Sequence, residues 1–163
     1  MKVGIVMGSK SDYAVVSRAE EVLQAFDVSY TTRIISAHRT PSAAEAFSKG
    51  AEGEGIEVII AAAGKAAHLA GVMAANTPLP VIGLPIKSST LDGLDSLLST
   101  VQMPKGVPVA TVAIDGAENA ALLAVQILSV RDPGLREAMR TYKRTTEREI
   151  MQADQEFQED RND

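Results

Sequence analysis

The sequence KVGIVMGSKSD (residues 2–12) joins a strand-like segment to a polar loop and the start of a helix. Residues 2–8 form a short run of β-branched and apolar residues ending at a glycine, which is typical of a strand buried on both faces. From Asp12 to Phe26, apolar residues recur at helical spacing. A buried strand followed by such a helix indicates a parallel sheet whose faces are covered by helices.

The same alternation continues along the chain. Four further apolar runs have the length and composition of strands, at residues 28–35, 56–64, 79–86 and 107–114. Helices are predicted between and after these strands. One starts at Thr40-Pro41, and three others cover residues 66–76, 118–130 and 133–158. We therefore expect an α/β fold with a parallel sheet and a long C-terminal helix.

Capping residues mark several of the predicted helix starts. Thr40 is a candidate N-cap, and Ser42 with Glu45 forms an alternative capping box one or two residues later. In the polar loop after the fourth strand, Asp92 and Asp95 are candidate caps.

Two segments carry apolar residues whose packing partners remain open. The leucines and the methionine of residues 85–104 are expected to lie in the core or in an interface. The helix at 133–158 has a narrow apolar stripe that suits either its own domain or a neighbouring subunit, at Leu135, Met139, Tyr142, Ile150 and Phe157.

Composition limits the classes of function. The 163 residues, 45% of them hydrophobic, suit one domain over 1–163 with a sizeable core. The net charge of −5 argues against nucleic acid or an anionic membrane as the main partner, although a local site can still bind an anion. The absence of cysteine excludes disulfides and thiolate metal sites, and two histidines make a histidine-rich metal site unexpected. With no signal-peptide pattern and no membrane-length apolar run, a cytoplasmic protein is expected.

The loop after the first strand has the chemistry of an anion site. In MGSKSD (residues 7–12), Gly8 allows a tight turn, and Ser9 and Ser11 offer hydroxyl groups beside exposed helix N–H groups. Asp12 can cap the helix or accept hydrogen bonds from a sugar diol, and taken alone the residue favours the cap.

Both histidines follow predicted strands. SAHRTP (residues 36–41) places His38 beside Arg39, whose planar guanidinium matches phosphate or carboxylate oxygens. AAAGKAAHLAG (residues 61–71) places His68 after the third strand. Each histidine alone could be an ordinary loop residue, but ligands bind at the carboxyl ends of parallel strands, and both histidines belong to that edge. No arrangement for nucleophilic catalysis is evident, whereas proton transfer near neutral pH has candidates.

Four motifs of this chain resemble, in their residues and in their order, the class I N5-carboxyaminoimidazole ribonucleotide mutases of purine biosynthesis. They are MGSKSD, SAHRTP, AGKAAHLAG and LDGLDSLLSTVQMPKGVPVATVAI. The resemblance runs from about residue 2 to residue 130. It implies a flavodoxin-like three-layer α/β/α fold, a homo-octamer with active sites at subunit junctions, and no metal or organic cofactor. The implied reaction moves a carboxylate from the exocyclic nitrogen of the aminoimidazole to ring carbon 4.

The resemblance also implies the roles of individual residues. His38 matches the acid/base histidine, and His68 matches the histidine of the second loop. Asp12 would bind the ribose hydroxyls, and Arg39 with nearby serines would hold the phosphate of a phosphoribosyl substrate. The implied substrate-binding residues are Gly8, Ser9, Ser11, Asp12, Ser36, Ala37, Arg39, Gly64, Lys65, Ala66 and Leu69.

The second loop departs from the family pattern. The family usually reads AGAGGAAHLPGM, and the substitutions in this chain are Ala62, Lys65, Ala70 and Val72. Lys65 adds bulk and charge beside the implied site, where it could point outward or help to bind an anionic group. The altered loop leaves open the direct carboxylation of aminoimidazole ribonucleotide by a class II enzyme. A non-catalytic phosphosugar-binding module is a further alternative.

Overall fold

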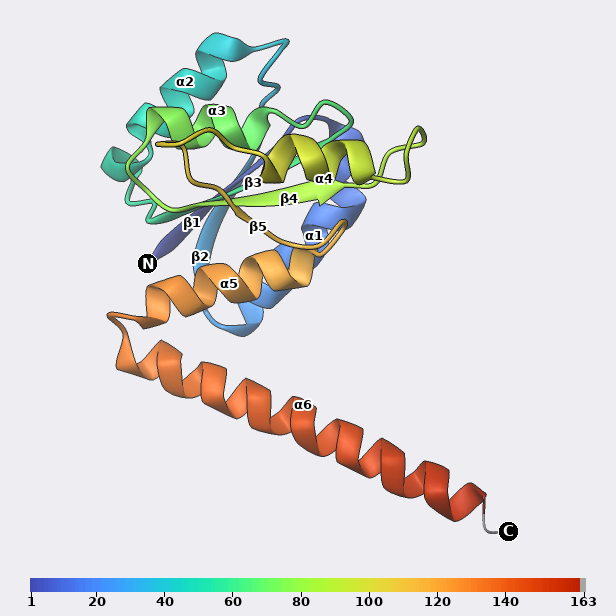
Figure 1. Cartoon of the computed structure of the whole chain (residues 1–163). Helices are drawn as coiled ribbons and strands as arrows, with labels where there is room; N and C mark the ends of the chain where they lie inside the picture. Colours follow the sequence, from blue (N-terminus) through green and yellow to red (C-terminus); the bar gives the residue numbers. More distant parts are fainter. Residues whose placement is uncertain (162–163) are drawn as a thin grey trace.

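In the computed structural model, which describes residues 1–161, five parallel strands form one sheet (Figure 1). Residues 162–163, the last two of the predicted domain, lie outside the described residues. The strands occur in the order β2-β1-β3-β4-β5, which is the flavodoxin-like order. They are β1 (Lys2–Met7), β2 (Ser29–Ile34), β3 (Val58–Gly64), β4 (Val81–Ile86) and β5 (Ala110–Thr111). The predicted fold class is confirmed.

Helices cover both faces of the sheet and make three layers (Figure 1). One face carries α1 (Tyr13–Ala25) and α5 (Ala117–Ser129), with α6 (Pro133–Asp160) packed outside α5. The other face carries α2 (Pro41–Gly50), α3 (Leu69–Asn76) and α4 (Leu94–Val101). Short 3₁₀ turns at Lys10–Asp12 and Glu52–Glu54 complete the elements.

The hydrophobic core is divided between the two faces of the sheet. Ile60 in β3 is fully buried in the cluster that includes α1 and α5, whereas its neighbour Ile59 is fully buried in the cluster that includes α2 and α3. Successive side chains of a strand point to opposite faces, so a central strand of this kind must be apolar at every position. Burial of each such side chain contributes about 1.5–3 kcal/mol.

Two predicted elements are shorter than expected. The strand predicted at 107–114 is wrong in extent, because β5 pairs with β4 only through Ala110 and Thr111. The helix predicted from residue 66 begins at Leu69. The preceding residues form a tight turn instead, in which the Ala67 N–H donates to the Lys65 carbonyl at 2.9 Å.

The predicted caps are also corrected. Asp92 and Asp95 are not caps of α4, because Gly93 occupies the N-cap position and the Asp95 carboxylate accepts from the Ser88 hydroxyl at 2.9 Å. Thr40 does occupy the N-cap position of α2, but its hydroxyl bonds to the backbone of Ser36 rather than to the helix.

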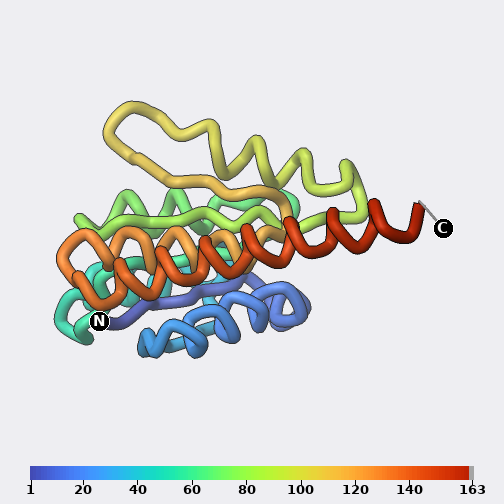
Figure 2. Tube along the Cα trace, turned by 90° about the horizontal axis from the view of Figure 1, so that it is seen from below, coloured from blue at the N-terminus to red at the C-terminus, as the bar shows by residue number. Residues whose placement is uncertain are grey.

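The last helix is anchored at its start and leaves the rest of the molecule toward its end (Figures 1 and 2). Leu135 and Met139 are buried, and the Tyr142 ring lies 5.7 Å from that of Phe26. Further along, the stripe residues Ile150 and Phe157 are exposed. The first half of the predicted stripe therefore packs on its own chain, and the second half does not.

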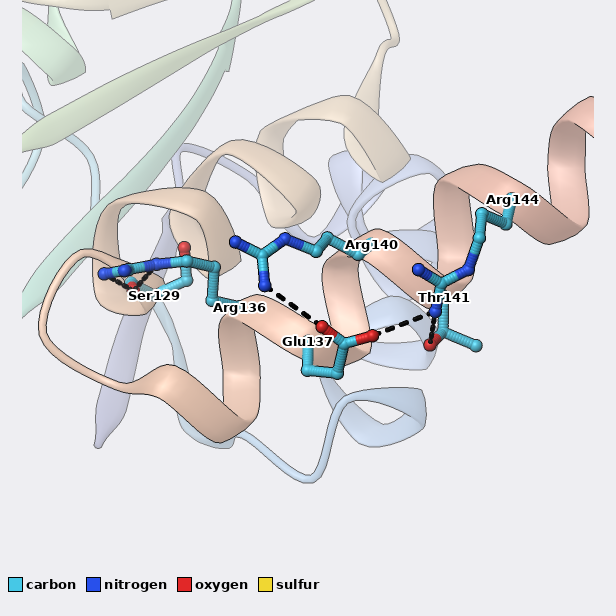
Figure 3. A network of polar contacts seen from close by, with 6 residues as sticks. All are labelled: Ser129, Arg136, Glu137, Arg140, Thr141 and Arg144. Atoms are coloured by element: carbon cyan, nitrogen blue, oxygen red, sulfur yellow. Dashed lines mark hydrogen bonds and ion pairs between the residues drawn. The ribbon is translucent and has the colours of Figure 1, made fainter.

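Polar contacts fix the junction between α5 and α6 (Figure 3). The Arg136 guanidinium donates to the Ser129 carbonyl, with its Nη2 at 2.7 Å. The next residue, Glu137, pairs with Arg140 at 3.1 Å and with Arg144 at 2.9 Å. These bonds satisfy a free carbonyl at the end of α5 and stiffen the exposed face of α6. Among the helices of residues 1–161, none combines the length and apolar character needed to cross a membrane.

Candidate active site

A cavity of about 580 Å³ opens at the carboxyl edge of the sheet, where the loops after β1, β2, β3 and β4 meet. The edge includes the point between β1 and β3 at which the strand order reverses, where flavodoxin-like folds bind their ligands. The cavity brings together all of the site residues expected from the sequence. These are Gly8, Ser9, Ser11, Asp12, Ser36, Ala37, His38, Arg39, Gly64, Lys65, Ala66, His68 and Leu69.

The loop after β1 is closed by a capping box. The Ser9 hydroxyl accepts from the Ser11 N–H at 3.3 Å, and the Asp12 carboxylate accepts from the Ser9 N–H at 3.1 Å. The Ser11 hydroxyl also donates to Asp12 at 3.2 Å. Asp12 precedes α1 directly, but its carboxylate makes no capping bond to that helix. Asp12 thus occupies the predicted N-cap position of α1, but its carboxylate bonds to Ser9 and Ser11 beside the cavity instead of to the helix.

Burial raises the pKa of Asp12 above its ordinary value. The side chain is a buried carboxylate with 8% of the residue exposed, and burial disfavours the charged form. Hydrogen bonds from Ser11 and Ser9 and the positive charge of Arg39 act in the opposite direction without cancelling the effect. The site thus holds a carboxylate whose charge is costly until a ligand supplies further donors.

We expect Asp12→Asn to raise the free energy of unfolding at neutral pH. A raised pKa means that the folded state binds the proton more tightly than the unfolded state, so stability falls as pH rises through the window between the unfolded pKa and the higher folded pKa. The variant should lose that pH dependence. Urea unfolding at a series of pH values from acid to neutral measures both effects.

The matched control is Asp154→Asn on the exposed part of α6, which should change stability by less than about 0.5 kcal/mol. If Asp12→Asn instead destabilises the protein at neutral pH, the carboxylate hydrogen bonds outweigh the burial of its charge.

Arg39 ties two loops of the edge together. Its Nη2 donates to the Gly8 carbonyl at 2.7 Å, and its Nε donates to the Ser36 hydroxyl at 3.3 Å. These bonds orient the guanidinium beside the serine loop while leaving several of its five N–H donors for a ligand. Arg39, Ser9 and Ser11 therefore form a cluster suited to phosphate oxygens.

The two histidines form a hydrogen-bonded pair on the cavity wall. The Nε2 atom of His38 lies 2.8 Å from the Nδ1 atom of His68, and the rings meet edge to face with centroids 4.9 Å apart. One facing nitrogen must carry a proton and the other must accept it, so the pair shares a single proton across this contact. The outer nitrogens, Nδ1 of His38 and Nε2 of His68, are not used in this contact, and the tautomer of each neutral ring decides which of them is a donor and which an acceptor. The arrangement suits general acid/base chemistry.

Four cavity residues were not expected from the sequence: Ala63, Ile86, Lys87 and Ser88. The last two belong to the loop after β4, which the carboxyl-edge rule does select. The Lys87 N–H donates to the Asp115 carboxylate at 2.8 Å, and its ammonium pairs with Asp92 at 3.2 Å. Only the fold brings Asp115 to this loop, so the sequence carried no signal for this anchoring.

The second loop contains an unusual backbone conformation. Lys65 has a φ of 56°, in the left-handed region that favours glycine, and its side chain is exposed at the cavity. Within residues 1–161, no three His, Cys, Asp or Glu side chains gather as a set of metal ligands.

Comparison with known proteins gives consistent matches. Residues 2–149 match the AIR carboxylase family. The N5-carboxyaminoimidazole ribonucleotide mutase of Pyrococcus abyssi is 58% identical over 147 residues, which cover 90% of this chain and 84% of that protein. The mutase of Thermotoga maritima is 52% identical over 158 residues, covering 97% and 92% of the two chains. The crystal structure of Treponema denticola PurE has a TM-score of 0.85 at 29% identity, covering 95% of this chain and 97% of that one.

Proposed function

Because this chain belongs to the AIR carboxylase family, we propose that it is an isomerase-type enzyme of purine biosynthesis that converts N5-carboxyaminoimidazole ribonucleotide to its 4-carboxy isomer. The observation that carries the proposal is the His38–His68 contact of 2.8 Å inside the cavity that the family motifs line. The histidine pair can transfer a proton, and it lines the same cavity as the phosphate-binding cluster of Arg39, Ser9 and Ser11. This combination matches the needs of the reaction better than those of a protein that only binds a phosphosugar.

The two ends of the proposed substrate have different partners. The phosphate lies against Arg39, Ser9 and Ser11, where charge-assisted hydrogen bonds are available. The ribose hydroxyls donate to the Asp12 carboxylate, which compensates for the burial of its charge. This arrangement directs the aminoimidazole toward the histidine pair.

In the chemical step, one proton passes from His38 to the substrate and a proton later passes back to His38. Protonated His38 gives its proton to the exocyclic nitrogen, the bond from that nitrogen to the carboxylate carbon breaks, and carbon dioxide is released inside the cavity. Carbon 4 of the aminoimidazole then attacks the carbon dioxide. The proton displaced from carbon 4 returns to His38, so no net proton is consumed. His68 orients the ring of His38 through their shared hydrogen bond.

Direct carboxylation of aminoimidazole ribonucleotide by a class II enzyme is the alternative, because Lys65 alters the second loop. The names and identities of the Pyrococcus and Thermotoga relatives favour the mutase. The assay supplies either the N5-carboxylated ribonucleotide or aminoimidazole ribonucleotide with bicarbonate, and follows the 4-carboxy product. If the protein turns over the N5-carboxylated ribonucleotide but not aminoimidazole ribonucleotide with bicarbonate, the mutase is supported. Efficient turnover with bicarbonate would assign the chain to the direct carboxylases instead.

A homo-octamer is the assembly that we propose, with α6 as one of its contact surfaces. Support comes from the exposed apolar residues Ile150, Met151 and Phe157 on a helix segment that extends away from its own chain (Figure 1). Most of the stability of a helix in a protein comes from packing of its apolar face, so an exposed apolar stripe favours docking on another subunit.

We expect the double substitution Ile150→Glu and Phe157→Glu to lower the mass of the assembly, because two buried charges would oppose helix docking. Light scattering on the full-length variant measures this. The control is Gln152→Glu with Gln155→Glu, which adds equal charge to the same exposed helix. An assembly of unchanged mass in the first variant would remove α6 from the proposed interface.

A further inference from the structure

Lys65 lies at a strained position on the wall of the cavity. Its φ of 56° falls in the left-handed region, which glycine adopts freely and lysine does not. The turn that holds it is fixed by two backbone bonds, from Ala67 to Lys65 and from His68 to Ala66, each 2.9 Å. Backbone strain at a site that glycine could occupy without cost points to a use for the lysine side chain.

The ammonium of Lys65 differs from the other cations that line the cavity. Arg39 donates to Gly8 and Ser36, and Lys87 pairs with Asp92 at 3.2 Å. Within residues 1–161, the Lys65 ammonium has no ion pair and no hydrogen bond. It is therefore the cavity cation that remains available to a ligand without giving up a protein partner.

The charges along the edge are arranged for a ligand with two anionic groups. The cavity is lined by three cationic side chains, Arg39, Lys65 and Lys87, against a single carboxylate, Asp12. Arg39 follows β2 and Lys65 follows β3, with β1 between them in the sheet. Arg39 donates to the Gly8 carbonyl and so belongs with the serine loop, whereas Lys65 shares the loop after β3 with His68, so the two cations can serve different groups of one ligand.

We propose that Lys65 is a specificity-determining residue that binds the migrating carboxylate of the substrate and of the product. This rests on the proposed function, in which the ribonucleotide carries a phosphate at one end and a carboxylate at the other. Lys65 and His68 belong to the same loop after β3, three residues apart, and both line the cavity with His38. Because the carboxylate charge is present before and after the reaction and absent in carbon dioxide, Lys65 stabilises the bound substrate and product and does not accelerate the chemical step.

The test compares two ribonucleotides that differ only in the carboxylate. Isothermal titration should show that Lys65→Met weakens binding of 4-carboxyaminoimidazole ribonucleotide about tenfold, as expected for one lost charge-assisted hydrogen bond, and leaves aminoimidazole ribonucleotide unchanged. The KM of the variant should rise without a fall in kcat. Lys65→Gly, which removes the ammonium and relieves the backbone strain, should show the same selective loss.

The control is Lys105→Met, an exposed lysine between α4 and β5 that lies outside the cavity lining, and this variant should bind both ribonucleotides normally. Equal weakening of both ribonucleotides by Lys65→Met would overturn the inference, because the contact would then be to the phosphate or to the fold. Unchanged affinity for both would overturn it as well. A wild-type protein that binds neither ribonucleotide would contradict both the proposed function and this inference. If the wild-type protein binds both ribonucleotides, a failure of the Lys65 prediction counts against this inference alone.

Discussion

Replacing His38 with asparagine is expected to lower kcat about 10²–10⁴-fold while the ribonucleotide still binds. Asparagine keeps a polar side chain at the cavity wall but cannot carry a proton to and from the substrate near neutral pH. Turnover of the N5-carboxylated ribonucleotide and its affinity, measured on the same preparation, separate the two effects. Circular dichroism of the variant checks that its fold is intact.

The same variant tests the non-catalytic alternative. A phosphosugar-binding module would depend on Arg39 and the serines and would leave both histidines idle. His68→Asn is the informative companion, because it removes the 2.8 Å partner of His38 without removing the His38 ring. We expect a smaller loss of kcat in that variant and an altered pH profile. Near-normal turnover of His38→Asn would end the acid/base assignment.

Replacing Arg39 with methionine is expected to raise the KM about 10- to 100-fold, because hydrogen bonds to a charged group are lost. The substitution also removes the positive charge that lowers the pKa of Asp12, so that pKa should rise further. Initial rates over a range of substrate concentrations measure the KM.

Arg33→Met is the matched control, since Arg33 is an exposed arginine of β2 outside the cavity lining. Arg39→Lys should recover only part of the affinity, because an ammonium cannot reproduce the planar fork of the guanidinium. A KM that is unchanged in Arg39→Met would move the phosphate to a different part of the cavity.

The alternating apolar runs allowed the fold to be predicted with small errors at the ends of elements. Strands β3 and β4 are buried on both faces, so their residues are apolar throughout and stand out in the sequence. The exception was β5, whose composition suits a longer strand. Only two of the six residues of β4 pair with it, and the extent of such pairing is a property of the sheet rather than of residues 107–114.

The candidate site was predictable for a related reason. Parallel strands bring their carboxyl ends to one edge, so the loops that follow them had to meet. The details of those contacts depend on distances between loops that are remote in sequence. Nothing in residues 7–12 distinguished a helix cap from a carboxylate turned toward Ser9 and the cavity.

Local sequence therefore determined the elements, their order of appearance and the edge on which the chemistry lies, because burial and helix periodicity act over a few residues. The tertiary structure decided the contacts across that edge. It paired His38 with His68, which lies thirty positions further along the chain, joined Lys87 to Asp115, and left the Lys65 ammonium without a partner among the described residues. Such contacts require the strands to be assembled, since only the packed sheet sets the distance from one loop to the next.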